Sequence, residues 1–320
     1  PTLKNSFINV QENNAIVPNL NQEKILSAEA NYLITSEKIK GRLSAYISEF
    51  RNGTTVSSFF AEIGSGADYF QEVVTNIDKR HLGIELGFQY QLTSAFNTSA
   101  VIAFGQHTYT NNANVSINFD TSDFSEDLIN PTSFENLGET YIKNYKVANG
   151  PQQAYSIGFE YKNPNYWSVN ASGNYFSNGY LAISNISRTS SFFNNPNDFG
   201  QPYQNVDLDL ARKLLKQEKF NPYFLVDLSA RKSWWIKGTT IKIVASIHNL
   251  FDKTYKSGGH EQSRTANYGA LVADTANGNL QRNFGPKYWY GFGRTYFINL
   301  AVGFKKRKSS KERFLKQNKY

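Results

Sequence analysis

The sequence predicts an all-β fold, a transmembrane antiparallel β-barrel with long extracellular loops, and three observations lead to it. Nine segments alternate apolar and polar residues with a period of two, which is the pattern of strands with one apolar face. The links between these segments are alternately short and long, as in outer-membrane barrels. Aromatic residues recur near the segment ends on the apolar side, where a membrane interface favours them.

The nine strands are expected, in chain order, at residues 26–34, 42–48, 82–92, 96–105, 154–161, 167–175, 224–230, 241–247 and 295–304. The third is the clearest, because apolar residues from Leu82 to Leu92 alternate with Gly83, Glu85 and Gln89. The short links are TSEK, TSA, KNPN and SWWIKG, and the long ones cover roughly residues 51–79, 110–152, 178–220 and 250–293.

A soluble β-sandwich is the alternative, since its strands also have one buried and one wet face. Strands of ten or more residues and the strict alternation of link lengths favour the barrel. The chain has no run of 18 apolar residues, so no membrane-spanning helix is predicted.

The formal net charge is +8, but residues 305–320 alone hold eight basic residues against one acid. The rest of the chain is near neutral, which argues against a nucleic-acid partner. Cysteine is absent, so disulfides and thiolate metal sites are excluded. The chain opens on the loop-like PTLKNSFINVQENN, with no initial methionine and no signal peptide, and is interpreted as a mature or truncated piece of something longer.

The sequence shows no catalytic or cofactor-binding motif. Neither an HExxH pair nor a GxSxG elbow is present, and the four histidines are far apart in sequence. They are His81, His107, His248 and His260. Sequence spacing does not exclude a catalytic Ser–His pair that is assembled from different strands. The chain is therefore predicted to be no enzyme and to hold no cofactor.

The last long link holds the candidate ligand-binding residues. Its aromatic cluster offers a stacking surface, although interfacial anchoring is the favoured interpretation. Its polar residues can recognise a solute, although loops are polar in any case. The candidates are Tyr288, Trp289, Tyr290, His260, Glu261 and Arg264.

Three further features complete the set of candidates. An acidic loop offers oxygen ligands for calcium from Asp120, Asp123 and Asp127, although a solvated loop is the favoured interpretation. A short helix is expected after Asp207 or Asp209, with an apolar stripe that packs on neighbouring loops. The polar strand faces would line a wet interior through Glu85, Gln89, Glu160, Asn170, Asp227, Arg231 and Lys242.

Two C-terminal motifs carry a family resemblance. HNLFDKTY at residues 248–255 and FGPKYWYGFGRTYFINLAVGF at residues 284–304 resemble the last two strands of TonB-dependent receptors, particularly those of the Bacteroidota. LKQEKFNPYFLVDLSARKSWW, HEQSRTANY and NIDKRHLGIELGFQYQL are similar to late strands and loops of the same family. The resemblance implies an outer-membrane location and about the last nine strands of a 22-stranded barrel that surrounds an N-terminal plug.

The resemblance also implies function and partners. The parent molecule would import a scarce extracellular ligand, driven by a TonB-type energising complex that engages a plug absent from this piece. Its partners would include outer-membrane lipids, with a surface lipoprotein or a periplasmic protein as further candidates. A structural, adhesive or assembly-complex barrel without transport is the alternative, and the ligand is not indicated by any loop motif.

Three regions are expected along the chain. Residues 1–24 would form an extracellular loop segment, residues 25–304 the transmembrane strands with their loops, and residues 305–320 a basic periplasmic tail. The tail would lie on the anionic leaflet or on an acidic partner through Lys305, Lys306, Arg307 and Lys308, or else stay solvated.

Overall fold

The computed structural model describes residues 2–8, 16–63, 66–119, 134–148, 150–264, 266–276 and 285–304. The calcium candidates Asp120, Asp123 and Asp127 lie outside the described residues. The tail residues Lys305, Lys306, Arg307 and Lys308 lie outside them as well.

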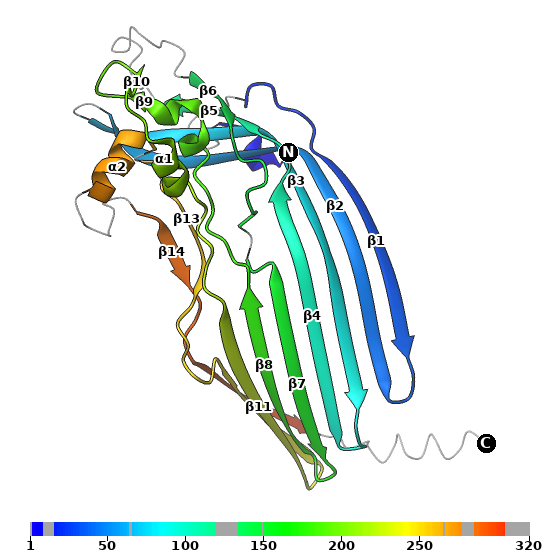
Figure 1. The fold of residues 1–320 in the computed structure, drawn as a ribbon. Helices are drawn as coiled ribbons and strands as arrows, with labels where there is room; N and C mark the ends of the chain where they lie inside the picture. Colours follow the sequence, from blue (N-terminus) through cyan, green and yellow to red (C-terminus); the bar gives the residue numbers. More distant parts are fainter. Residues whose placement is uncertain are drawn as a thin grey trace, which may run out of the picture.

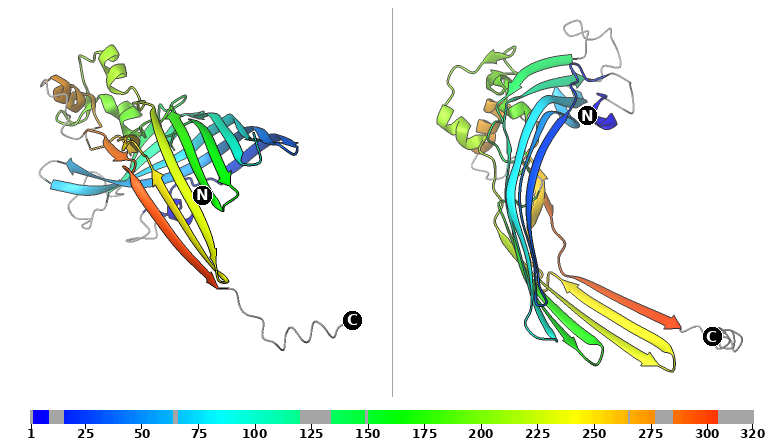
Figure 2. Two further views of the ribbon diagram at one scale, coloured as in Figure 1. Left: turned by 90° about the horizontal axis from the view of Figure 1, so that it is seen from below. Right: turned by 90° about the vertical axis from the view of Figure 1, so that its right-hand side faces the viewer.

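Nine long strands form a curved antiparallel wall in which each strand pairs with its neighbours in chain order (Figures 1 and 2). Each predicted strand is present, and most are longer than expected. Their bounds are β1 Lys24–Thr35, β2 Ile39–Ile63, β3 Gly66–Gln91, β4 Phe96–Tyr109, β7 Gln153–Asn163, β8 Trp167–Ser177, β11 Tyr223–Ile236, β12 Thr239–His248 and β15 Thr295–Phe304. The turn between β11 and β12 takes just Lys237 and Gly238, both at positive φ (46° and 86°), the conformation of a type I′ hairpin turn.

The register places apolar and polar residues on opposite faces of the wall. Leu86 lies opposite Leu43 and Ile102, whereas the adjacent Glu85 lies opposite Ser44 and Ala103. The apolar face stays open: Ile84 and Phe104 are each 52% exposed. In a sandwich a second sheet would bury this face, and no second sheet covers it in the described part of the chain. The wall therefore has the surface of a membrane barrel.

The prediction of a long loop at residues 51–79 is wrong. β2 and β3 continue there as one hairpin, with pairs from Gly53–Ile77 to Ile63–Gly66. Register shifts at Gly53 mark where the hairpin leaves the wall, since extra residues in one strand bend a ladder. β5 Ala113–Phe119 pairs with this extension of β3, and β6 Phe134–Thr140 pairs with β5.

The long links and this hairpin build a packed body on the loop side of the wall (Figure 1). Its short elements are η1 Leu3–Asn5, η2 Ile186–Arg188, η3 Ser190–Phe193, β9 Asn194–Asn195, β10 Gln201–Pro202, α1 Leu208–Leu214, β13 Lys256–His260, α2 Tyr268–Ala276 and β14 Lys287–Tyr290. Its hydrophobic clusters centre on Val74 and Ile142, on Phe192 and Tyr268, and on Val17 and Val73. The hydrophobic cores thus lie outside the wall.

The predicted short helix is α1. Asp207 caps it, because its Oδ1 accepts the backbone N–H groups of Asp209 and Leu210 at 2.9 and 3.0 Å. Ala211 is buried against Phe192 and Tyr268, so the expected packing on neighbouring loops is confirmed. Among the described helices, none has the length and apolar character needed to cross a membrane.

Candidate functional site

The polar face of the wall carries all seven residues predicted to line the interior. One cross-strand row joins Gln89, Ser99, Gly158, Ser172 and Asp227. The next row joins Asn97, Glu160, Asn170, Ser229 and Ser246. Because directly opposite residues of paired strands share a side, both rows lie on one face. By the same register Glu85, Arg231 and Lys242 lie opposite Ser44, Ser168 and Ser233 on that face.

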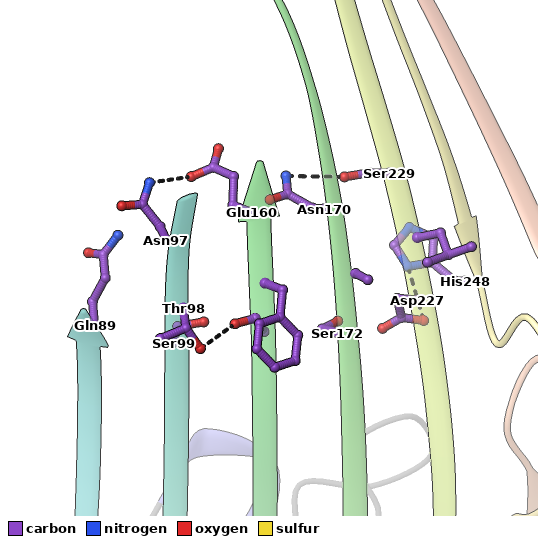
Figure 3. Close-up of a pocket in the computed structure, with 14 residues that line it drawn as sticks. Gln89, Asn97, Thr98, Ser99, Glu160, Asn170, Ser172, Asp227, Ser229 and His248 are labelled. Carbon is purple, nitrogen blue, oxygen red and sulfur yellow. Dashed lines mark hydrogen bonds and ion pairs between the residues drawn. The ribbon is translucent and has the colours of Figure 1, made fainter. Parts of the chain in front are cut away.

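These two rows border a shallow depression of about 360 Å³ (Figure 3). Asn97 donates to Glu160 Oε2 at 3.3 Å, and Asn170 donates to Ser229 Oγ at 3.4 Å. Asp227 Oδ2 accepts from Asn174 at 3.0 Å. The depression therefore offers amides, hydroxyls and carboxylates, groups suited to a hydrated surface or to a polar protein partner.

A serine and a histidine do approach each other on this face. Ser246 Oγ lies 3.4 Å from His248 Nε2, and His248 Nδ1 lies 3.6 Å from Asp227 Oδ1. Both separations exceed the reach of about 2.6–3.2 Å expected of a nucleophile and its base. Asp227 Oδ1 already accepts the backbone N–H of Asn249 at 3.0 Å. The contact therefore supports a structural corner at the end of β12.

A second hollow, the loop-side cavity, lies in the packed body and has a volume of about 530 Å³. The hairpin extension forms one wall, and the links after β8 and β13 form the others. It is lined by Ser57, Ser58, Phe59, Glu72, Ile183, Ser184, Asn185, His260, Glu261, Gln262, Ser263, Arg264 and Lys287. The structure thus brings three of the predicted ligand-binding residues, His260, Glu261 and Arg264, into one cavity.

A buried ion pair holds two walls of the cavity together. Arg188 donates to both carboxylate oxygens of Glu261, and its side chain is 2% exposed. The same guanidinium donates to the carbonyl oxygens of Ser184 and Leu215, each at 2.9 Å. Burial lowers the pKa of Arg188, but the hydrogen bonds and charge of Glu261 more than offset this and raise it. Both carboxylate oxygens of Glu261 are therefore used to hold the cavity wall in position.

Glu72 is a buried carboxyl group at the back of the cavity. It accepts from Asn185 Nδ2 at 2.7 Å and from Ser263 Oγ at 3.5 Å. Burial raises its pKa more than these hydrogen bonds lower it. Burial and the charge of Lys287 lower the pKa of His260, which also lines the cavity. The cavity thus offers an imidazole ring, an ammonium group and hydroxyls to a solute.

The predicted aromatic cluster lies beside the cavity and does not line it. Tyr288 donates its hydroxyl to Glu218 at 2.6 Å, and Lys256 Nζ lies 3.4 Å from the Tyr288 ring centre. Trp289 packs on Gly258, where an added Cβ would lie 2.8 Å from the indole, and its ring centre is 5.7 Å from that of His260. Trp289 and Tyr290 are each 58% exposed and remain available for contact.

Sequence reasoning missed Glu72, Arg188 and Lys287. Glu72 lay in a presumed loop, and Arg188 pairs with a residue 73 positions away. No local pattern marks such a pair. The position of Glu72 next to the apolar residues Val73 and Val74 was the signal in the sequence for a buried carboxyl group.

A family model described as "TonB dependent receptor-like, beta-barrel" matches residues 1–250. Solved structures similar to the chain include the copper transporter OprC, with 18% identity and a TM-score of 0.45 over 89% of this chain and 32% of that one. The ferric yersiniabactin uptake receptor FyuA from Yersinia pestis shows 12% identity and a TM-score of 0.47 over 88% of this chain and 30% of that one. BauA, the ferric preacinetobactin receptor from Acinetobacter baumannii, shows 16% identity and a TM-score of 0.44 over 90% of this chain and 30% of that one.

The chain spans about a third of the length of these structures. No curated protein matches it. Since the family model covers well over half of the chain, the chain belongs to the TonB-dependent receptor-like β-barrel family of outer-membrane proteins.

Proposed function

We propose that this chain supplies part of the barrel wall and part of the extracellular ligand site of a receptor that imports a scarce solute. The observation that carries the proposal is the loop-side cavity, which gathers His260, Arg264 and Lys287 from one long link beside the hairpin extension. Family membership supports uptake in general terms. Members are transport receptors and not enzymes, so the prediction of a non-enzymatic protein is confirmed.

The geometry supports separate roles for the loop-side cavity and for the polar face of the wall. Solute capture needs a preformed concave site with a few oriented polar groups, and the Arg188–Glu261 pair fixes such a site before a ligand arrives. The polar face of the wall, with Gln89, Glu160 and Asp227, would then face a plug and the path of the solute. Release would follow from pulling on the plug by a TonB-type complex, with no covalent step in this chain.

Ligand binding by the full-length receptor tests the proposal. The purified protein would be screened by thermal shift against ferric chelates, copper and other scarce solutes, and any hit measured by calorimetry. His260→Ala combined with Lys287→Ala is expected to weaken that binding at least tenfold, because it removes two of the polar groups that face the cavity. Arg212→Ala is the control, because the Arg212 side chain is exposed on the solvent side of α1. Unchanged affinity in the double variant would place the ligand elsewhere.

Several finer assignments belong to the same proposal. HNLFDKTY and the run at residues 284–304 support a receptor of the Bacteroidota type. The basic segment 305–320 would lie in the periplasm, against the phospholipid leaflet or an acidic partner. A surface lipoprotein over the loop-side body would be compatible with exposed Trp289 and Tyr290. The full-length reading frame separates this proposal from a structural or adhesive barrel, because transport requires a plug with an energy-coupling motif.

A further inference from the structure

Two histidines face each other on the polar face of the wall, near the loop-side body. His81 of β3 lies directly opposite His107 of β4. The ring centres are 4.3 Å apart, and the ring planes are inclined by 21°. His81 and Glu85 are separated by an even number of positions along β3, and side chains alternate along a strand. Both rings therefore lie on the face of Glu85.

The backbone brings the two histidines close together. The N–H of His107 donates to Gln152 Oε1 at 3.1 Å, and its carbonyl oxygen accepts from Gln152 Nε2 and from the N–H of Val147, each at 3.0 Å. Both backbone groups of His107 thus bond away from β3. His81 and His107 form a non-hydrogen-bonded pair, the kind in which opposite side chains of an antiparallel sheet come closest.

Tyr46 of β2 converges on the same point. Its hydroxyl oxygen lies 3.4 Å from His107 Nε2. The next cross-strand row supplies the space, because it holds Gly83 and Gly105. A Cβ at Gly83 would lie 2.7 Å from the Tyr46 hydroxyl, and a Cβ at Gly105 would lie 3.1 Å from His107 Nε2. Glycine at both positions allows this close approach.

The imidazole nitrogens of the pair have unused bonding capacity. His81 Nε2 is enclosed and has no hydrogen-bond partner among the described residues. An enclosed polar atom without a partner is costly. The contact of His107 Nε2 with Tyr46 is long for a hydrogen bond at 3.4 Å. Lys79 and Glu85 flank the pair along β3 with opposite charges, so a cation meets no net repulsion from these two residues.

We propose that His81 and His107 bind a divalent transition-metal ion, with Cu²⁺ as the preferred ion and the Tyr46 hydroxyl beside it. Imidazole is a ligand that suits copper, zinc and nickel, and Cu²⁺ binds most tightly in the divalent series. Metal–imidazole bonds are about 2.0–2.1 Å long. Rotation of the two stacked rings about their side-chain bonds lets one nitrogen of each reach a shared ion.

The site is open and therefore exchangeable. Structural zinc sites are closed by four protein ligands. In the part of the chain that the structure describes, no three residues of the histidine, cysteine, aspartate and glutamate types gather in the way a metal ion requires. Two imidazoles leave coordination positions for water or for a passing ligand. Neither histidine lines the loop-side cavity, so the inference goes beyond the proposed solute site and does not depend on it.

Copper binding by the full-length, untagged receptor tests the inference. Cu²⁺ titrations would be followed by calorimetry with glycine as a competing chelator, and by electron paramagnetic resonance. We expect a site with two imidazole nitrogens that binds Cu²⁺ more tightly than Zn²⁺. His81→Gln and His107→Gln should each weaken Cu²⁺ binding about tenfold or more, and the double variant little further, because either change removes the chelate. His248→Gln is the matched control and should change nothing, since His248 is an exposed histidine of the same face.

Unchanged affinity in both single variants would overturn the inference, and so would an equally large loss in His248→Gln. A copper signal with one imidazole nitrogen or none would overturn it as well. If the variants do not fold on heat-modifiability gels, the intact receptor would be treated with Cu²⁺ and ascorbate and its peptides analysed by mass spectrometry. Oxidation should then concentrate on His81 and His107, and oxidation confined to other histidines would reject the site.

Discussion

Leu86→Arg tests the assignment of the two faces of the wall. Leu86 lies between Leu43 and Ile102 on the apolar face, five residues before the end of β3 at Gln91. At about 3.3 Å per residue and a tilt of about 40°, it lies about 13 Å from that end. This is the middle of an apolar band about 25 Å tall, where an arginine costs about 2–4 kcal/mol.

Two assays measure this cost. Heat-modifiability on gels gives the folded fraction in outer membranes, and unfolding of the purified receptor by guanidinium gives the free energy of unfolding. Ile243→Arg should behave like Leu86→Arg, because Ile243 lies opposite Leu300 on the same face. Gln89→Arg on the polar face and Gln106→Arg at the interface should each cost about 1 kcal/mol or less. The reverse ranking would refute the assignment of faces.

Three further changes test the loop side. Glu261→Ala leaves the buried guanidinium of Arg188 without its carboxylate, so we expect local stability to fall by about 3–5 kcal/mol. The fall would be measured as lost hydrogen-exchange protection at residues 183–188. Retained protection there would contradict this prediction. Asn249→Ala removes hydrogen bonds to Lys253 and to the carbonyl of Phe292, and should cost about 2–4 kcal/mol in the unfolding of the receptor. Burial raises the pKa of Glu72, so its contribution to stability is fully present below its ordinary pKa and is lost as the pH rises through the raised value. Glu72→Gln should remove that loss, and identical pH profiles of unfolding in both proteins would refute the argument.

The nine strands of the wall could be predicted because each has one apolar and one polar face. In β3 the alternation from Leu82 to Tyr90 leaves little choice of register. The same strand was missed at residues 66–79, and the structure shows both of its faces buried at residues 70–74. Val73 packs on Val17, and the adjacent Val74 packs in the cluster around Ile142. A strand buried on both faces loses its alternation, and register shifts near Gly53 disturb the phase further.

The candidate site could be predicted only in part, because a sequence pattern reveals residues that are close together in the chain. His260, Glu261 and Arg264 are neighbours in sequence, so their common polarity marked one loop. Their partners come from distant segments: Asn185 reaches Glu72 across 113 positions, and no local signal encodes that contact. Sequence reasoning also treated Glu261 as a ligand contact, whereas the structure shows it bound to Arg188.

Under the proposed function, the cross-links within the loop-side body limit how ligand preference can change during evolution or engineering. Grafting one of these loops from another family member would leave the guanidinium of Arg188 or the carboxyl group of Glu72 buried without its partner. A new specificity built by recombination therefore requires the hairpin and the links after β8 and β13 to be exchanged as a set. The side chains of Ser57 and Lys287 line the cavity and form no such cross-link within the described residues, so single substitutions there can retune the site and leave its frame intact.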